Sequence, residues 1–174
     1  MTYDPRKLPH VVADYYGNLP HPDVPEVKVK EYEAFAKVAA RFFENPKPER
    51  EQISQAFHLL NNAGLSPAQF ERVWDIAKPL ANRLLGTPPT IHDLDMLRDA
   101  HPGDIQKYYL DHPHPKYPEV SAGDFNRYYH AATPIAQQQI GRFPVEHEVA
   151  RFAAAGYDTQ DMANHYTDTT KGSK

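Results

Sequence analysis

A chain of 174 residues is long enough for one domain with a hydrophobic core, or for two very small ones. Its formal net charge of −4 is modest, and it contains no cluster of Lys and Arg, so the composition does not favour binding to nucleic acid. No cysteine occurs, which excludes disulfides, thiolate metal sites and thiol catalysis.

The sequence gives no indication of a membrane protein. The first 20 residues lack the apolar segment of a signal peptide, and no apolar run is as long as a membrane span. We therefore expect synthesis in the cytoplasm and no membrane partner. The 17 prolines favour extended arms and sharply ended helices over sheets.

Residues 1–27 are predicted to form a proline-rich extended arm. Five prolines in this stretch disfavour regular structure and favour a polyproline-type extension. Between them lie the side chains of Val11, Val12, Tyr15 and Tyr16, which would be costly to leave in water. The arm is expected to pack either on its own domain or on a neighbouring subunit, and the sequence leaves both alternatives open.

Residues 28–166 are predicted to form a helical domain, because apolar residues recur there at spacings of three and four. Expected helices begin near residues 28, 49, 66, 90, 104, 121, 144 and 157. No stretch alternates apolar and polar residues for long, so no strand is expected. The fold class is therefore all-α, with about seven or eight short helices. We expect the polar tail at residues 167–174 to be disordered.

The segment 66–94 is similar to the segment 121–149. A shift of 55 residues aligns the two without a gap, with nine of 29 positions identical, and so predicts an internal repeat. Pro79 and Pro134 fall at matching points inside two predicted helices, where a proline removes a backbone hydrogen bond and bends the helix. We therefore expect two related kinked-helix units joined by a proline-rich linker. Within that linker, residues 113–120 match residues 20–27 at six of eight positions.

Two arginines also occupy matching positions in the repeat. Arg72 and Arg127 flank the aromatic face of their predicted helices, and each has a possible partner in a carboxylate or in the end of a neighbouring helix. We expect both to act as buried structural clamps, alongside Pro79 and Pro134.

Paired tyrosines are predicted to contribute to a surface. Adjacent residues on a helix diverge, so one ring of each pair is expected to lie at the surface. Tyrosine is enriched at protein interfaces because it covers apolar area and keeps a polar tip. The candidate partner-binding residues are Val11, Val12, Tyr15, Tyr16, Tyr108, Tyr117 and Tyr128.

The stretch 59–73 has the spacing of a helix-turn-helix, with a turn glycine at Gly64 and a capping Ser66, and the stretch 152–162 repeats it around Gly156. A DNA-binding protein of this type would place Ser66–Arg72 in the major groove. The exposed residues of that helix include a single basic side chain, so phosphate neutralisation would be poor. A pair of helices joined by a glycine turn simply to pack together is the commoner explanation of this spacing.

The histidines and carboxylates form no specific catalytic or metal-binding motif. The possible ligands are His92, Asp93, His112, His114, Glu146, His147 and Glu148. Their spacings do not match a zinc motif, and carboxylates two residues apart on a helix point away from each other. We predict no catalytic, cofactor-binding or metal-binding residues, and we interpret the histidines as surface or capping residues.

The sequence therefore favours a non-enzymatic structural or interaction protein, a helical adaptor in a larger assembly. Its expected partners are proteins, either further copies of the chain or other subunits, bound through the N-terminal arm. One such role is that of a component of a virion or a phage connector. The first alternative is a helix-turn-helix regulator that binds nucleic acid, and the second is a helical enzyme with a His/carboxylate site.

Overall fold

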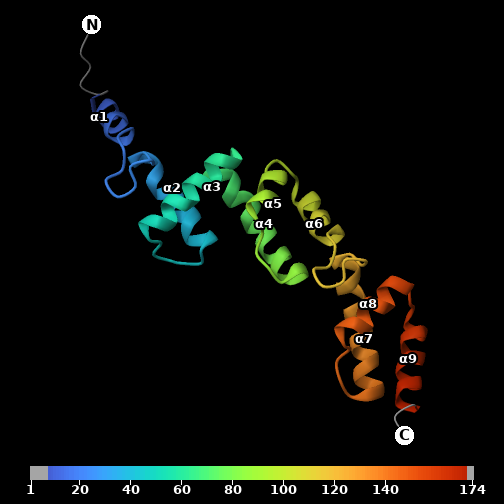
Figure 1. The fold of residues 1–174 in the computed structure, drawn as a ribbon. Helices are drawn as coiled ribbons and strands as arrows, with labels where there is room; N and C mark the ends of the chain where they lie inside the picture. Colours follow the sequence, from blue (N-terminus) through green and yellow to red (C-terminus); the bar gives the residue numbers. More distant parts are fainter. Residues whose placement is uncertain (1–7, 172–174) are drawn as a thin grey trace. The chain divides into compact units, whose positions relative to one another are not determined.

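The computed structural model describes residues 8–171 (Figure 1). This part of the chain is built of helices without a named strand, which confirms the all-α fold class. Within it, no helix has the length and apolar character needed to cross a membrane. The helices are α1 Leu8–Gly17, α2 Val29–Phe42, α3 Arg50–Ala63, α4 Pro67–Leu85, α5 Ile91–Met96, α6 Pro102–Asp111, α7 Ala122–Ile140, α8 Glu146–Ala155 and α9 Thr159–Lys171.

The helices form two compact units in place of the single helical domain predicted over residues 28–166. Unit 1 comprises the described residues up to Asp75 together with Thr90–Asp99. Unit 2 comprises Ile76–Pro89 and the described residues from Ala100 onward. Helix α4 therefore contributes its first half to unit 1 and its second half to unit 2.

The core of unit 1 lies between α2, α3 and the first half of α4. On α3 the buried residues Ile53, Ala56 and Leu60 recur at the three- and four-residue spacing of one helix face. The ring of Trp74 stacks on that of Phe70, with centroids 5.1 Å apart. Helix α3 is capped at its C-terminal end by Gly64, whose φ of 68° is a left-handed conformation that glycine adopts without steric cost.

The core of unit 2 is formed where α8 and α9 pack on α7. Two buried alanines of α7, Ala132 and Ala136, contact the cluster of Phe152, Met162 and Tyr166 from the other two helices. Small side chains at these two positions let the larger rings of α8 and α9 approach the α7 backbone closely. This packing fixes the position of α9 against α8.

The extended arm predicted over residues 1–27 is wrong for Leu8–Gly17, which form the helix α1. The prolines on either side explain this: Pro9 lies in the first turn, where a missing N–H costs little, and the next proline is Pro20. The intervening apolar residues have helical spacing. Residues 1–7 of the predicted arm lie outside the described residues.

The tail predicted to be disordered over residues 167–174 is also partly helical, because α9 continues to Lys171. Hydroxyl groups support its last turns: Thr167 donates to the carbonyl of Ala163 and Thr169 to that of His165, each over 2.9 Å. Residues 172–174 lie outside the described part of the chain.

The helices α4 and α7 share local features at the positions that the sequence aligns. Both have 19 residues, with Pro79 and Pro134 at the same point inside them. Ser66 and Ser121 each accept a hydrogen bond at 3.1 Å from the backbone N–H three residues later. The location of both prolines inside helices is thus confirmed, whereas the bend at each proline and the repeat of two whole units stay predictions.

Candidate functional site

Two loops with the sequence Pro-His-Pro-x-x-Pro-Glu-Val have the same backbone hydrogen bonds. The N–H of His21 donates to the carbonyl of Val27 over 2.8 Å, and the N–H of His114 donates to that of Val120 over 2.9 Å. Each loop is closed by an isolated antiparallel bridge, between Pro20 and Lys28 in the first and between Pro113 and Ser121 in the second. Residues 20–27 and 113–120 therefore form equivalent turns.

The histidine of each loop stabilises the turn through its Nδ1, so this nitrogen is already engaged in a hydrogen bond within the loop. Nδ1 of His21 accepts the N–H of Asp23, and Nδ1 of His114 accepts that of Lys116, each over 3.1 Å. The rings pack on aromatic residues, His21 on Tyr32 at 3.6 Å between centroids and His114 on Phe125 at 4.2 Å. Burial lowers the pKa of His114 and so favours its neutral ring.

The similarity extends from the loops into the helices on both sides. A shift of 93 residues aligns 9–39 with 102–132 without a gap, and ten of the 31 positions are identical. This alignment pairs α1 with α6 and α2 with α7. The identical residues include the tyrosine pairs Tyr15-Tyr16 and Tyr108-Tyr109. Sequence reasoning found the loop but missed this longer correspondence, although the tyrosine pairs five residues before each loop were a signal for it.

The paired helices cross at equivalent positions, with the glycine on opposite helices. A Cβ placed on Gly17 of α1 would lie 3.1 Å from Cβ of Lys30 on α2. In the second pair, a Cβ on Gly123 of α7 would lie 2.9 Å from the carbonyl oxygen of Leu110 on α6. Because the 93-residue shift maps position 17 onto 110 and position 30 onto 123, both pairs have the same close approach.

The two first helices differ in what covers them. The side chains of Val12, Tyr15 and Tyr16 on α1 are 42%, 64% and 59% exposed, and their spacing places them on one side of the helix; Leu19, two residues beyond its end, is 38% exposed. We call these four residues the α1 face. In α6 the residues aligned with Val12 and Tyr16 are Ile105 and Tyr109, and both are 0% exposed. The same positions are thus open in unit 1 and buried in unit 2.

Apart from Val11, the other candidate partner-binding residues lie in unit 2 and are half-buried. The ring of Tyr108 meets that of Tyr109 edge-on at 5.1 Å, and the ring of Tyr117 stacks on Phe125 at 5.9 Å. Tyr128 packs against the core cluster of unit 2. Val11 belongs to α1, but its side chain is outside the described part of the structure. The structure therefore places Tyr15 and Tyr16 together on α1, whereas Tyr108, Tyr117 and Tyr128 lie half-buried against neighbouring rings or the core of unit 2.

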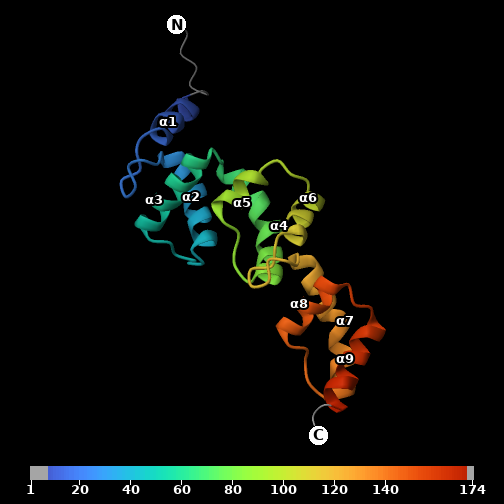
Figure 2. The ribbon, with the colours of Figure 1, turned by 45° about the vertical axis from the view of Figure 1, so that its right-hand side comes forward.

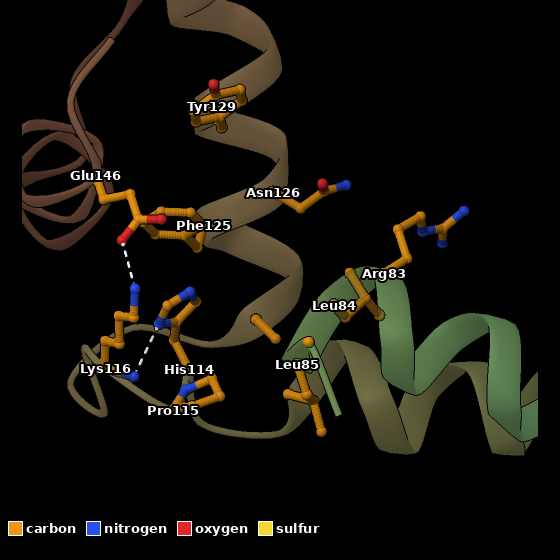
Figure 3. Close-up of a pocket in the computed structure, with 12 residues that line it drawn as sticks. Arg83, Leu84, Leu85, His114, Pro115, Lys116, Phe125, Asn126, Tyr129 and Glu146 are labelled. Carbon is orange, nitrogen blue, oxygen red and sulfur yellow. Dashed lines mark hydrogen bonds and ion pairs between the residues drawn. The ribbon is translucent and has the colours of Figure 1, made fainter. Parts of the chain in front are cut away.

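A cavity of about 330 Å³ lies beside the second loop, between the end of α4 and the start of α7 (Figure 3). His114, Phe125 and Tyr129 form an aromatic wall, and Leu84 and Leu85 line another part of it. An ion pair of 3.2 Å between Lys116 and Glu146 lies at its edge. The walls suit a small apolar group.

A buried carboxylate connects α8 to α9. Glu148 is 8% exposed, and its Oε1 accepts a hydrogen bond of 2.8 Å from the phenol of Tyr166. Its Oε2 lies 3.3 Å from Nε2 of His165 and 3.6 Å from the guanidinium of Arg142. Glu148 was considered as a metal ligand from the sequence, but its present partners are these three side chains.

These contacts set the protonation states of the carboxylate and the phenol. Burial is the largest influence on Glu148 and raises its pKa, but the hydrogen bonds from Tyr166, from the N–H of Val145 and from His165 outweigh it. The charge of Arg142 adds to them, so the pKa of Glu148 lies below its ordinary value. Burial and the neighbouring carboxylate together raise the pKa of Tyr166 well above its ordinary value.

The predicted buried clamps Arg72 and Arg127 are both exposed. Arg72 donates to the carbonyl of Arg98, just after α5, which agrees with a partner at the end of a neighbouring helix. Arg127 pairs with Asp124 of its own helix at 3.0 Å, with its side chain 71% exposed. The prediction of burial was wrong because the long aliphatic stems let both guanidinium groups reach the surface.

The clamp that sequence reasoning missed is Arg98. Its guanidinium donates to the carbonyl of Ala63 over 2.6 Å and to that of Gly64 over 2.7 Å, and so satisfies the end of α3. It also pairs with Asp95. No local pattern identifies this contact, because the partners are 34 and 35 residues apart in the chain.

The helix-turn-helix prediction concerns the turns at Gly64 and Gly156. Both glycines are left-handed caps, with φ of 68° and 69°, and each is followed by a new helix. The exposed residues at the start of α9 include Gln160, Asp161 and Asn164. The turns thus have the expected local geometry, and the helices that follow them present few basic side chains, as the sequence indicates.

Within residues 8–171, no group of three or more histidine and acidic side chains converges as a metal site would require. The chain matches no family model, and no curated protein or solved structure is found to be similar to it.

Proposed function

We propose that this chain is a non-enzymatic helical adaptor that binds a protein partner through the α1 face. The observation that carries the proposal is the exposure of Val12, Tyr15 and Tyr16 along one side of α1 and of Leu19 just beyond its end, at 38% to 64%. Apolar and aromatic side chains gathered on one surface mark interaction sites more often than single exposed ones do. Tyrosines in particular give large contact areas with little loss of conformational entropy.

The packing of α1 supports a role in trans. The helix already contacts α2 of its own chain, and the close approach of Gly17 to Lys30 lies on that side. The α1 face is exposed to solvent and is therefore accessible to another molecule. We place the protein, made in the cytoplasm, in a larger assembly whose other subunits are further copies or different proteins. A virion or phage connector is one such assembly.

A photo-crosslinking experiment tests this function. Tyr15 is replaced by p-benzoylphenylalanine in the full chain, in the cells that produce it. The matched control places the same group at Phe143, which is 60% exposed but lies in unit 2. We expect a discrete crosslinked protein from position 15 and none, or a different one, from position 143. Equal, diffuse crosslinking from both positions would contradict the proposal.

The second candidate function is a helix-turn-helix regulator that binds nucleic acid. The two turns at Gly64 and Gly156 favour it, since each joins two helices through a left-handed glycine. A gel-shift assay at low salt with duplex DNA tests it, because electrostatic binding is strongest there. Lack of any retardation at about 50 mM salt would exclude this function.

A further inference from the structure

We propose that the cavity beside the second loop binds a small aromatic carboxylate, with its ring against Phe125 and Tyr129 and its carboxylate at Arg83 and Asn126. Such a site is independent of the adaptor function and of the α1 face, because every residue that lines the cavity belongs to unit 2. The cavity volume of about 330 Å³ lies within the range of about 300–1,000 Å³ that is typical of sites for small molecules.

The cavity has apolar walls from separate segments of unit 2. In both views the end of α4 lies beside the loop that leads into α7, and Leu84 and Leu85 of α4 line the cavity there (Figure 1 and Figure 2). Figure 3 shows the rings of Phe125 and Tyr129 one above the other along α7, with His114 below Phe125. Aromatic rings on one wall and aliphatic side chains on another are the usual lining of a site for a planar apolar group.

The charged side chains that line the cavity are two cations, Arg83 and Lys116, and one anion, Glu146. Lys116 and Glu146 form an ion pair of 3.2 Å at one side of the cavity. Arg83 lies on the other side (Figure 3) and makes no hydrogen bond or ion pair with any residue in the described range 8–171. His114 adds no charge, since its Nδ1 accepts the N–H groups of Lys116 and Tyr117 and burial lowers its pKa. One negative charge on a ligand therefore balances the cavity.

Arg83 and Asn126 favour a carboxylate as the carrier of that charge. A guanidinium presents paired N–H donors in one plane, which match the two oxygens of a carboxylate. The side-chain amide of Asn126 is half-buried, lies on the same side of the cavity as Arg83 and has no hydrogen-bond partner within the described residues. Its two N–H donors are thus available to the ligand. The carboxylate of Glu146 across the cavity disfavours a second negative charge, such as that of a phosphate monoester.

The first loop has the same turn but different residues at the matching positions of its helix. The 93-residue shift aligns Asn126 with Glu33, so a carboxylate replaces the amide. It aligns Tyr129 with Ala36, so a methyl group replaces the ring. The turn therefore requires neither Asn126 nor Tyr129, and their place beside the cavity supports a separate role for them. The first loop also supplies informative substitutions for a test.

The experiment titrates the isotopically labelled full chain with benzoate and follows the backbone amide chemical shifts by NMR. We expect saturable shifts in the second loop and at the start of α7. Benzamide has the same ring without the charge and should bind about tenfold more weakly. Phenyl phosphate should also bind more weakly than benzoate, because Glu146 repels its second charge.

Variants of the chain test the two ends of the site. Arg83→Gln removes an exposed charge and should weaken benzoate binding about tenfold. Asn126→Glu and Tyr129→Ala introduce the residues of the first loop, and each should weaken binding at least as much. The matched control Arg151→Gln changes an exposed arginine of unit 2 that does not line the cavity, and it should leave the affinity unchanged. Circular dichroism of each variant shows that its helix content is intact.

Several outcomes would overturn the proposed site. They are the lack of saturable shifts with benzoate up to about 10 mM, shifts confined to other parts of the chain, and equal binding of benzoate and benzamide. Unchanged affinity in Arg83→Gln would do the same, and tighter binding of phenyl phosphate would assign the site to a phosphate group instead. None of these results affects the adaptor function, which depends on the crosslink from position 15 of α1.

Discussion

The phenol of Tyr166 donates a hydrogen bond of 2.8 Å to the buried carboxylate of Glu148, and this bond joins α9 to α8. Substitution of Tyr166 by Phe keeps the ring in the core and removes the donor. We expect a loss of about 1–3 kcal/mol in the free energy of unfolding, because a buried carboxylate is left with fewer partners. Urea denaturation measures it.

The control for this substitution is Tyr157→Phe. Tyr157 also packs on Phe152, but its hydroxyl makes no hydrogen bond within the described part of the chain. Its stability should change by less than about 0.5 kcal/mol. Equal losses for both variants would show that the Tyr166–Glu148 bond does not stabilise the unit.

The lowered pKa of Glu148 predicts how stability depends on pH. The pKa of this carboxyl is lower in the folded state than in the unfolded state, so the ionised group stabilises the fold. This stabilisation is fully present above the ordinary glutamate pKa of 4.5. It is lost as the pH falls from that value through the lower pKa of the folded state. We expect Glu148→Gln to flatten this acid loss of stability, measured as unfolding free energy between about pH 6 and pH 3.

Glu146→Gln is the matched control for the pH experiment. Glu146 lies two residues away, is exposed and pairs with Lys116 at the surface, where an ion pair contributes little. Its variant should keep the acid slope of the unaltered chain. If Glu148→Gln also keeps that slope, the contacts of Glu148 with Arg142, His165 and Tyr166 do not control acid stability.

Gly123→Ala should destabilise unit 2. The added Cβ would lie 2.9 Å from the carbonyl oxygen of Leu110, and backbone atoms cannot move aside without shifting α6. We expect a loss of about 1–3 kcal/mol, the usual cost of overpacking, measured by thermal or urea unfolding. Gly103→Ala in α6 meets no atom within 4 Å, so it should be neutral or slightly stabilising. Equal tolerance of both would contradict the tight crossing.

Arg98→Ala should lower the stability of unit 1 by about 1.5–3 kcal/mol, because charged hydrogen bonds to the carbonyls of Ala63 and Gly64 are lost. Arg127→Ala is the control at a position where the guanidinium is exposed and pairs within its own helix. Its effect should stay below about 0.5 kcal/mol. A larger loss for Arg127→Ala than for Arg98→Ala would restore the clamp predicted from the sequence.

The all-α fold could be predicted because its determinants are local. Capping serines, turn glycines and three- and four-residue apolar spacing act within a few residues, and Ser66, Gly64 and Ser121 all have the expected roles. Helix α1 was missed because flanking prolines outweighed the spacing of four apolar residues.

The contacts that define the candidate sites could not be predicted in the same way. Glu148 meets Tyr166 and His165 across two helices, and Arg98 reaches a helix end more than 30 residues away. Such pairs depend on how helices pack, which local spacing does not encode. Whether Tyr16 is open or covered likewise depends on which segment lies beside it.

The glycine at the helix crossing lies on the first helix of one pair and on the second helix of the other, so helices cannot be exchanged singly between the two pairs. Each crossing holds one side chain: Lys30 opposite Gly17 in the first, and Leu110 opposite Gly123 in the second. A chimera that places α6 on α2 would bring Leu110 against Lys30, two side chains where only one fits. The reciprocal chimera would bring Gly17 against Gly123 and leave a gap. The two helices of each pair are thus matched to each other, and grafts between the pairs must carry both helices together.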